Sequence, residues 1–247
     1  MTKAEIQLIR SLHDKRGRTE QGLFIAEGEK LIAEIRSSRL RIRTIYALDG
    51  VFDGAEVVTV TPKEMERISL LKTPSKALAV VEIPHYTLHP SELRERLVLA
   101  LDEVQNPGNL GTILRVADWF GITDVVCSPD SADCFNPKVV QATMGAILRV
   151  RVHYVELKKW LGTMREAGIP IYGTFLEGES LYHTELTPHG VVVMGNEGRG
   201  ISEEVAQEIT RKVLIPPYPA DRRTTESLNV AMATGIICAE FRRRCLK

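Results

Sequence analysis

The stretch VVVMGNEGRGIS, residues 191–202, combines three glycines with a carboxylate in a pattern that can hold a small ligand. Its four leading apolar residues predict a short buried strand. Gly195, Gly198 and Gly200 then predict a tight turn, and Ser202 is a favourable N-cap for a helix that follows. A strand, turn and helix in this order lie at the carboxyl edge of a parallel sheet, where such sheets bind ligands.

The charge of this loop indicates which ligand it could accept. Glu197 lies in the turn, and Glu203 and Glu204 occupy the first helical turn, where a phosphate would otherwise meet free N–H groups and the helix dipole. The spacing G-x-x-G-x-G also differs from the G-x-G-x-x-G pattern of dinucleotide-binding loops. The loop therefore favours a ligand with no phosphate and some positive charge. The alternative is a solvated turn whose carboxylates are favoured by the helix dipole.

Arg115 lies on a predicted helix that follows the turn QNPGNLG, residues 105–111, on the side opposite the apolar stripe. Its position next to the glycine turn that ends a strand makes Arg115 hard to explain as a structural residue. The alternative is a surface ion pair with Asp118 at i+3, which contributes a few tenths of a kcal/mol.

The stretch TTESLNVAMATG, residues 224–235, is the third with polar groups at a predicted helix start. Thr225 or Ser227 is expected to cap a final helix that runs from about Ser227 to Arg243. Ser227 and Asn229 would then stand where free backbone N–H groups point outward, so that capping and ligand contact are compatible roles.

The composition limits the classes to which the protein can belong. With 247 residues and 44% apolar content, the chain can form one large domain or two small ones. It has no run of eighteen apolar residues and no signal-peptide core, so we expect a cytoplasmic protein with no membrane partner. The four cysteines form no C-x-x-C pair, so we expect no disulfides. His85 and His89 would share a helix face, but Pro90 disfavours a helix across both and no third ligand is near, so we expect no metal ion.

The net charge is zero, but basic residues gather near both ends of the chain. Residues 1–43 carry ten Lys or Arg against six Asp or Glu, and residues 222–247 carry six against two. Because affinity for a phosphate backbone depends on local charge, either end could contact nucleic acid. The equally favoured alternative is that these basic residues lie on solvated helix faces and contact no nucleic acid.

Strands and helices alternate in both halves, which predicts an α/β protein. The first half is predicted to hold a helix carrying Leu31, Ile32 and Ile35, a polar loop over 13–22, other helices over 4–12 and 62–71, and strands over 23–26, 42–49, 56–61 and 77–84. The second half is predicted to hold strands over 97–104, 123–129, 151–155, 169–176, 191–195 and 213–217, with helices over 109–121, 137–148, 157–168, 201–209 and 227–243. This rhythm predicts a mostly parallel sheet covered on both faces. A change of composition near Pro84 predicts a first domain over 1–84, a linker over 85–96 and a second domain over 97–247.

Taken together and in this order, NPGNLGTILRVADWFG, VVVMGNEGRGIS and VLIPP followed by ESLNVAMATG resemble the three motifs of the SpoU (TrmH-type) RNA ribose 2′-O-methyltransferases. The likeness extends to GLFIAEGEKLIAE, which resembles the family's substrate-binding domain, and to KVVQATMGAILRV. The resemblance implies S-adenosylmethionine as methyl donor and a homodimer with active sites at the subunit interface. It also implies a C-terminal parallel-sheet SPOUT domain with a deep trefoil knot, which spacing alone could not indicate, and a small N-terminal α/β domain like ribosomal protein L30e.

The resemblance also assigns roles to individual residues. The catalytic candidates are Asn109, Arg115, Glu197, Ser227 and Asn229. The candidates for the cofactor cradle are Thr174, Gly195, Asn196, Glu197, Gly198, Ile215, Leu228 and Asn229. The candidate RNA contacts are Arg16, Arg18, Lys30, Arg115, Arg222 and Arg223. The last two belong to PPYPADRRTTE, a loop several residues longer than the family's usual one.

The implied reaction is methylation of a ribose 2′-hydroxyl in RNA, with 23S rRNA favoured over tRNA because the chain has a separate N-terminal domain. The alternatives are the same reaction on tRNA, an inactive RNA-binding protein on this fold, and a nucleotide-dependent α/β enzyme, which the acidic loop disfavours. Arg115 resembles the residue assigned as general base in the family. Deprotonating a free guanidinium at neutral pH costs about 8 kcal/mol, so stabilisation of the developing alkoxide is the other role left open.

Overall fold

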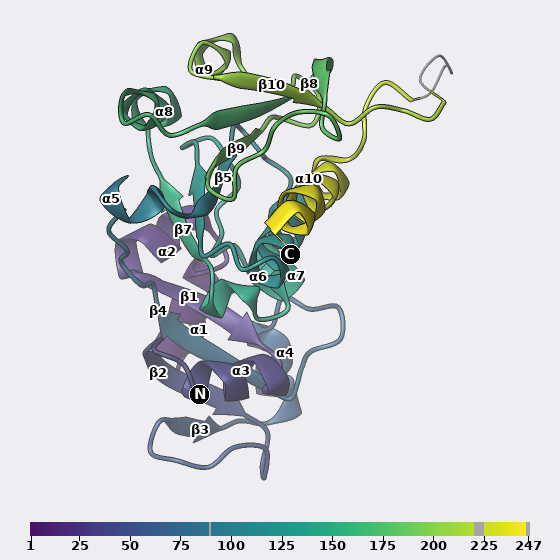
Figure 1. The fold of residues 1–247 in the computed structure, drawn as a ribbon. Helices are drawn as coiled ribbons and strands as arrows, with labels where there is room; N and C mark the ends of the chain where they lie inside the picture. Colours follow the sequence, from purple (N-terminus) through teal and green to yellow (C-terminus); the bar gives the residue numbers. More distant parts are fainter. Residues whose placement is uncertain (89, 220–224, 246–247) are drawn as a thin grey trace. The chain divides into compact units, whose positions relative to one another are not determined.

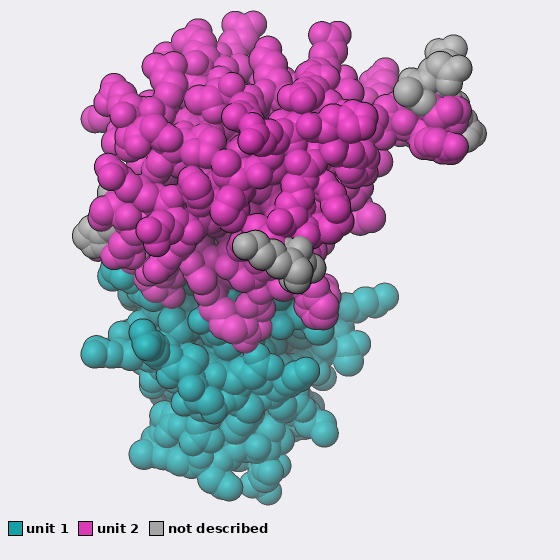
Figure 2. Space-filling model, viewed as in Figure 1, with its two compact units in different colours: residues 1–85, 133–148 teal, residues 86–132, 149–247 magenta. Residues whose placement is uncertain are grey.

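The structure is a computed structural model that describes residues 1–88, 90–219 and 225–245 (Figure 1). It divides into two compact units, coloured in Figure 2: unit 1 is residues 1–85 with 133–148, and unit 2 is residues 86–132 with 149–247. The first segment of unit 1 ends one residue beyond the predicted boundary at Pro84. Residues 133–148, which the prediction included in the second domain, group with unit 1. The roles predicted for the two domains stay predictions.

Unit 1 is built on a four-stranded sheet in the order β1–β4–β2–β3, where β4 is antiparallel to both of its neighbours and β3 is parallel to β2. The strands are β1 (Leu23–Glu27), β2 (Ile42–Ala47), β3 (Val57–Thr59) and β4 (Ala77–Glu82). All four confirm strands predicted from the sequence. Because side chains alternate along β4, Leu78 and Val80 enter one core and Ala77, Ala79 and Val81 enter another.

Helices supply the rest of both cores of unit 1. The core that contains Leu78 is completed by α1 (Lys3–Ser11) and α4 (Pro62–Ile68), each of which begins with a threonine capping box. The core that contains Ala79 is completed by α3 (Glu29–Arg36) and α7 (Pro137–Thr143), which is followed by the short 3₁₀ turn η1 (Ala146–Leu148).

The polar loop predicted over residues 13–22 is wrong, because it contains the helix α2 (Lys15–Gln21). Arg18 on this helix is only 2% exposed. Its Nη1 donates to the carbonyl oxygens of Leu12 (2.8 Å) and His13 (2.9 Å), and its Nη2 donates to Asp133 Oδ2 at 2.6 Å. A charged residue can be buried when every polar group has a partner, so Arg18 replaces the apolar stripe that a helix usually carries.

These contacts correct the prediction that Arg18 meets RNA, because its guanidinium is buried within unit 1. Arg16 on the same helix is exposed and pairs with Glu20 at i+4, and Lys30 at the start of α3 is exposed. The RNA contacts expected of Arg16 and Lys30 stay predictions. Arg222 and Arg223 lie outside the described residues.

Unit 2 holds a six-stranded sheet in the order β10–β8–β9–β5–β6–β7, and every neighbouring pair is parallel. The strands are β5 (Leu97–Leu101), β6 (Asp124–Cys127), β7 (Arg151–Tyr154), β8 (Ile171–Ser180), β9 (Gly190–Met194) and β10 (Arg211–Leu214). The sequence-based expectation of a parallel sheet is confirmed. Its central strands, β5, β6 and β9, are buried along their whole length, as expected for a sheet covered on both faces.

Helices cover both faces of this sheet. The helices of unit 2 are α5 (Pro90–Leu93), α6 (Pro107–Trp119), α8 (Leu157–Glu166), α9 (Glu203–Ala206) and α10 (Val230–Cys245). Residues of α8 and α9 share one core with Val98, Val191 and Val193. On the other side α10 packs against α6, and Phe241 of α10 meets the ring of Tyr172 edge-on at 5.0 Å. Among the described residues, no helix is long and apolar enough to cross a membrane.

The strand order places a topological switch point between β5 and β9. The chain leaves β5 for α6 on one face of the sheet and leaves β9 for α9 on the other, so that the two loops diverge at the carboxyl edge. In open parallel sheets a crevice at this position is the usual ligand site. The loops after Leu101 and Met194 are therefore the expected place for a ligand site.

The basic C-terminal segment anchors α10 instead of facing solvent as a free cationic surface. Arg242 donates to the carbonyl of Phe120 at 2.7 Å, and Arg244 donates to the carbonyls of Leu181 and Thr184 at 2.9 and 2.5 Å. Hydrogen bonds from Arg243, opposed by burial and reinforced by Arg244, lower the pKa of Glu240 to about 2. Two of the six basic residues counted near this end thus complete the fold of unit 2.

Replacing Arg18 with Met is expected to lower the free energy of unfolding of unit 1 by about 3 kcal/mol, because Asp133 and two carbonyls lose their partner. Urea denaturation followed by circular dichroism measures the change. Arg16→Met is the matched control on the same helix, where the side chain is 88% exposed. The control should change the free energy by less than about 0.5 kcal/mol. Equal effects of the two substitutions would contradict a structural role for Arg18.

Candidate active site

The glycine loop after β9 is a tight turn held by its own backbone. Asn196 and Gly200 exchange both N–H···O bonds at 2.9 Å, and Asn196 Oδ1 accepts from the N–H groups of Gly198 (2.9 Å) and Arg199 (3.1 Å). A Cβ on Gly195 would lie 2.2 Å from the carbonyl carbon of Gly200, so only glycine allows the loop to close. The predicted N-cap is confirmed, since Ser202 Oγ accepts from the N–H of Val205, the third residue of α9.

The loop that follows β5 fastens this turn to the sheet. The buried carboxylate of Asp102 accepts the N–H of Ser202 at 2.7 Å. Asn196 Nδ2 donates to the carbonyl of Glu103 at 2.8 Å, and Arg199 forms an ion pair with the Glu103 carboxylate. The two loops that diverge at the switch point therefore act as one rigid edge.

Three residues singled out from separate stretches of the sequence meet in one hydrogen-bonded chain. Asn229 Nδ2 donates to Asn109 Oδ1 at 3.0 Å, and Asn109 Nδ2 donates to Glu197 Oε1 at 2.8 Å. Both asparagines stand at helix starts: Asn109 in the first turn of α6, and Asn229 before α10, where its Oδ1 accepts from the N–H of Ala231 at 3.0 Å. The chain thus fixes the Glu197 carboxylate on the glycine loop, which is otherwise exposed.

Asn229, and neither Thr225 nor Ser227, caps the last helix. The expected start near Ser227 is therefore wrong by about one turn, because residues 227–229 are not helical and α10 begins at Val230. The Asn229 side chain both caps α10 and donates to Asn109, which in turn donates to Glu197. The position of α10 therefore helps to fix the position of the glycine loop.

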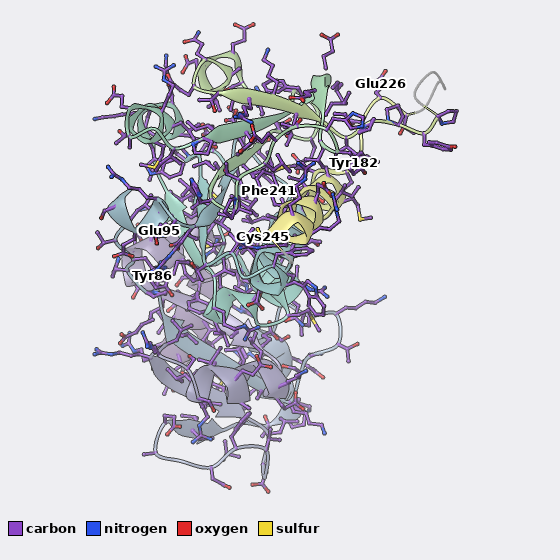
Figure 3. The ribbon with its side chains drawn as sticks, viewed as in Figure 1. Tyr86, Glu95, Tyr182, Glu226, Phe241 and Cys245 are labelled. Atoms are coloured by element: carbon purple, nitrogen blue, oxygen red, sulfur yellow. The ribbon has the colours of Figure 1, made fainter. Side chains whose placement is uncertain are left out.

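A cleft of about 490 Å³ opens at this edge of unit 2, and we call it the carboxyl-edge cleft. It is lined by Thr174, Phe175, Leu176, Glu177, Met194, Gly195, Asn196, Glu197, Gly198, Arg199, Gly200, Ile201, Lys212, Glu226, Ser227, Leu228, Val230 and Ala233. Its volume and its mixture of apolar and polar groups suit one small organic ligand. Figure 3 labels Glu226, one of the lining residues.

Among the described residues that line the carboxyl-edge cleft, carboxylates outnumber cations. Glu177, Glu197 and Glu226 face two basic side chains that are already engaged. Arg199 pairs with the carboxylate of Glu103, and the ammonium of Lys212 lies 4.9 Å from the centre of the Phe175 ring. The cleft therefore carries a negative charge that suits a cationic ligand and opposes a polyphosphate.

The structure places most of the predicted cradle around this cleft. The cradle candidates that line it are Thr174, Gly195, Asn196, Glu197, Gly198 and Leu228, and the catalytic candidate Ser227 lines it as well. Asn229 is linked to it through Asn109, whereas Ile215 is not among its lining residues. The cofactor contact expected of Ile215 stays a prediction.

Three lining residues of β8 that follow the predicted Thr174 were missed from the sequence. This strand leaves its ladder with β10 after Gly173 and rejoins it at Glu179, so that residues 174–178 bulge toward the cleft. Phe175, Leu176 and Glu177 line the cleft because of this excursion. The glycines at 173 and 178 are the one sequence signal that could have marked it, since glycine inside a strand often accompanies a bulge.

Arg115 does not line the carboxyl-edge cleft of its own chain. It is exposed on α6, and the predicted alternative, an ion pair with Asp118, is wrong because Asp118 binds Arg149 through two parallel contacts of 2.9 and 2.8 Å. Arg115 shares a face of α6 with Trp119 at i+4, which is 85% exposed. The Arg115 guanidinium is therefore exposed and lies outside the lining of this cleft.

Replacing Gly195 with Ala should disrupt the glycine loop, because the added methyl group would meet backbone at 2.2 Å and backbone cannot rotate away. We expect a loss of about 3 kcal/mol or more in the free energy of unfolding of unit 2, measured by urea denaturation. In the control Gly198→Ala the nearest atom lies at 3.7 Å, an ordinary contact, and the loss should stay below about 1 kcal/mol. A Gly195 variant as stable as the control would contradict this account of the turn.

Comparison with known proteins supports what the geometry indicates. The model of the SpoU rRNA Methylase family matches residues 96–239, and that of the MRM3-like substrate binding domain matches residues 3–79. A TrmH-family structure from Porphyromonas gingivalis is 42% identical and covers 99% of both chains, with a TM-score of 0.90. An AdoMet-bound rRNA methyltransferase from Sinorhizobium meliloti is 30% identical over 100% of this chain and 97% of that one, with a TM-score of 0.88. The 23S rRNA (guanosine(2553)-2′-O)-methyltransferase RlmP of Bacillus subtilis is 29% identical and covers 94% of each chain. The chain therefore belongs to the SpoU rRNA methylase family.

Proposed function

We propose that the protein transfers a methyl group from S-adenosylmethionine to a ribose 2′-hydroxyl of RNA, with 23S rRNA as the substrate. The observation that carries this proposal is the hydrogen-bonded chain from Asn229 through Asn109 to Glu197, which joins the three motif stretches at the edge of one acidic cleft. Relatives named as 23S rRNA 2′-O-methyltransferases, and solved relatives that bind AdoMet, support the same reaction.

The carboxyl-edge cleft fits this methyl donor. S-adenosylmethionine carries a positive sulfonium and no phosphate, which suits a cleft with three carboxylates and two engaged cations. Phe175, Leu176 and Leu228 offer apolar surface to a flat aromatic base. Residues that would hold the methyl donor are thus the glycine loop, the excursion of β8 and the segment before α10. No group of His, Cys, Asp and Glu among residues 1–88, 90–219 and 225–245 is arranged to hold a metal ion, and methyl transfer needs none.

The protein's own groups must align the ribose and stabilise its oxygen. The methyl donor would supply an electrophilic methyl carbon: the 2′-oxygen forms a bond to it as the carbon–sulfur bond breaks, S-adenosylhomocysteine leaves, and the hydroxyl proton passes to water or to the adjacent phosphate. A guanidinium near the ribose stabilises the developing alkoxide and binds the adjacent phosphate, which is the role we propose for Arg115. We assign Glu197, Ser227 and Asn229 to positioning the methyl donor and the nucleotide.

We further propose that the active protein is a homodimer that uses the exposed face of α6 and α10. Trp119 on α6 is 85% exposed and Met232 on α10 is 64% exposed, and two packed helices that both present large apolar side chains are typical of an interface. Because Arg115 shares the Trp119 face and does not line its own carboxyl-edge cleft, it would serve the cleft of the partner. This arrangement explains why an arginine with no described partner is placed away from the cleft of its own chain.

The trefoil knot, the likeness of unit 1 to ribosomal protein L30e and a cytoplasmic location complete the proposal. For the knot, the supporting observation is that α10 returns to pack against α6, while Arg244 binds carbonyls of the segment between β8 and β9. For unit 1, it is the sheet covered on both faces by helices, together with the match to a substrate-binding domain. The cytoplasmic location is proposed because the proposed substrate is 23S rRNA.

Arg115→Ala is expected to slow methyl transfer to 23S rRNA by a factor of about 10² to 10³, because one charged stabiliser of the alkoxide is lost. Binding of S-adenosylmethionine, measured by calorimetry, should not change. Arg165→Ala, which removes a half-exposed arginine of α8, is the control and should retain normal turnover. A variant at position 115 with near-normal turnover would refute the catalytic role.

Trp119→Asp is expected to shift the protein from dimer to monomer in sedimentation experiments, because a charge replaces an exposed aromatic anchor of the interface. Unfolding of unit 2 should be little affected, since the side chain is 85% exposed. Leu70→Asp, which alters a 47% exposed apolar side chain of unit 1, is the control and should leave the dimer intact. Unchanged sedimentation of the Trp119 variant would overturn the proposed interface.

A further inference from the structure

A second cleft, of about 570 Å³, lies at the amino edge of the sheet of unit 2. Its lining residues precede β5 and β6, begin β7 and end α10: Glu95, Arg96, Leu97, Gly121, Thr123, Arg149, Arg151 and Arg242. We call it the arginine cleft. Because all strands are parallel, it lies at the opposite edge from the carboxyl-edge cleft. Figure 3 labels Glu95 of the one and Glu226 of the other, and the two stand apart in that view.

The guanidinium groups of the arginine cleft are held in fixed directions. Arg149 binds Asp118 through two parallel contacts, and Arg151 Nη2 donates to Asp124 Oδ2 at 2.7 Å. Arg242 is held by the carbonyl oxygens of the chain after α6, the shortest contact being 2.7 Å. A guanidinium has five N–H donors in one plane. One that uses two of them for a protein partner still has N–H donors with which to bind an anion.

Asp124 is the buried group on which two of these arginines converge. Burial raises its pKa, but hydrogen bonds from His153 and Arg151 more than offset this and hold the pKa well below its usual range. Arg96 approaches the same carboxylate to 3.6 Å from the linker before β5. The carboxylate is therefore charged at neutral pH and orients the cations without filling the cleft.

Arginines outnumber carboxylates among the residues that line the arginine cleft. Its lining holds four arginines and one carboxylate, that of Glu95, while Asp118, Asp124 and Glu92 act on these arginines from outside the lining. Among the described residues, Arg242 has carbonyl oxygens as its hydrogen-bond partners. Leu97 is the one large apolar residue among its lining residues, whereas protein partners are usually anchored by apolar or aromatic side chains in a pocket. Oriented guanidinium groups in an open, polar cleft are the arrangement that binds phosphate oxygens.

We propose that the arginine cleft binds the phosphodiester backbone of the RNA substrate at nucleotides outside the one that is methylated. The inference rests on the proposed function, which makes RNA the polyanion that this surface meets. The five residues of β5 separate the two edges by about 15 Å, so the phosphates held here flank the reacting ribose at a distance. The cleft anchors the RNA, and the carboxyl-edge cleft performs the chemistry.

The test compares two double variants of the full-length protein. Arg96→Gln with Arg149→Gln removes the two most accessible arginines of the cleft, which are 45% and 53% exposed, and spares Arg151 and Arg242, whose contacts support the fold. The matched control, Arg165→Gln with Arg211→Gln, removes the same charge from side chains that are 50% and 42% exposed and also paired. The probe is an unmodified 23S rRNA transcript, with binding measured from 50 to about 300 mM salt.

We expect the cleft variant to bind the transcript about 10- to 100-fold more weakly near 100 mM salt, and its slope of log affinity against log salt to fall by about 1 to 2. The control variant should stay within about twofold of wild type. Equal losses in both variants, or wild-type affinity in the cleft variant, would overturn the proposal.

Two further measurements separate this proposal from the proposed function. Binding of S-adenosylmethionine should be the same in both double variants, which excludes a folding defect as the cause of weaker RNA binding. If the wild type methylates no RNA, the proposed function fails, while a selective loss of transcript binding in the cleft variant still supports the arginine cleft. If the wild type also binds no transcript, the arginine cleft proposal is overturned as well.

Discussion

The hydrogen bonds from Asn229 to Asn109 and from Asn109 to Glu197 are the interactions on which the candidate site depends. Each asparagine belongs to the start of a helix, so its side chain can move only if that helix moves. The Glu197 carboxylate is therefore positioned by α6 and α10, although it lies on a loop that follows β9. A loop of glycines could not hold a charge in place without such support, because glycine adds no packing of its own.

The parallel strands of unit 2 explain how the proposed methyl-transfer site and the proposed RNA-binding cleft can lie at opposite edges of one sheet. Every loop that leaves a strand of unit 2 stands at the carboxyl edge, and every loop that enters one stands at the amino edge. Carboxylates gather in the cleft at the first edge, and arginines gather in the cleft at the second. An acidic cleft admits a sulfonium compound while repelling RNA phosphates from the methyl-donor pocket, and a basic cleft about 15 Å away can hold those phosphates.

Local patterns in the sequence predicted most elements of the fold, because burial imposes a regular spacing on apolar residues. The patterns failed where the stabilising partner is distant in the chain. The helix α2 was predicted as a loop because Arg18, its buried residue, depends on Asp133, 115 residues away. The start of α10 was placed too early because Asn229 caps the helix while bound to Asn109, which no local rule weighs.

In the candidate site, too, features set by neighbouring residues could be predicted, whereas features set by distant segments could not. The glycine loop and the polar residues of the three stretches could be predicted, since turn chemistry and charge are local properties. Of the lining from β8, Thr174 was predicted, but Phe175, Leu176 and Glu177 were not, because the excursion of residues 174–178 appears only in the register with β10. The arginine cleft also escaped prediction, because its members are single residues from separate segments that only the parallel sheet brings together. Arg242 was counted among the basic residues near the C-terminus, but charge alone could not show that it joins Arg96, Arg149 and Arg151.

Calorimetric titration of the wild-type protein and of Glu197→Gln with S-adenosylmethionine and with ATP tests the central claim most directly. The account predicts that the wild type binds the sulfonium compound and not the triphosphate. It also predicts that neutralising Glu197 weakens binding of the sulfonium compound by about tenfold, which corresponds to about 1.4 kcal/mol. A wild-type protein that prefers ATP, or that binds S-adenosylmethionine no better than the variant does, would contradict the account.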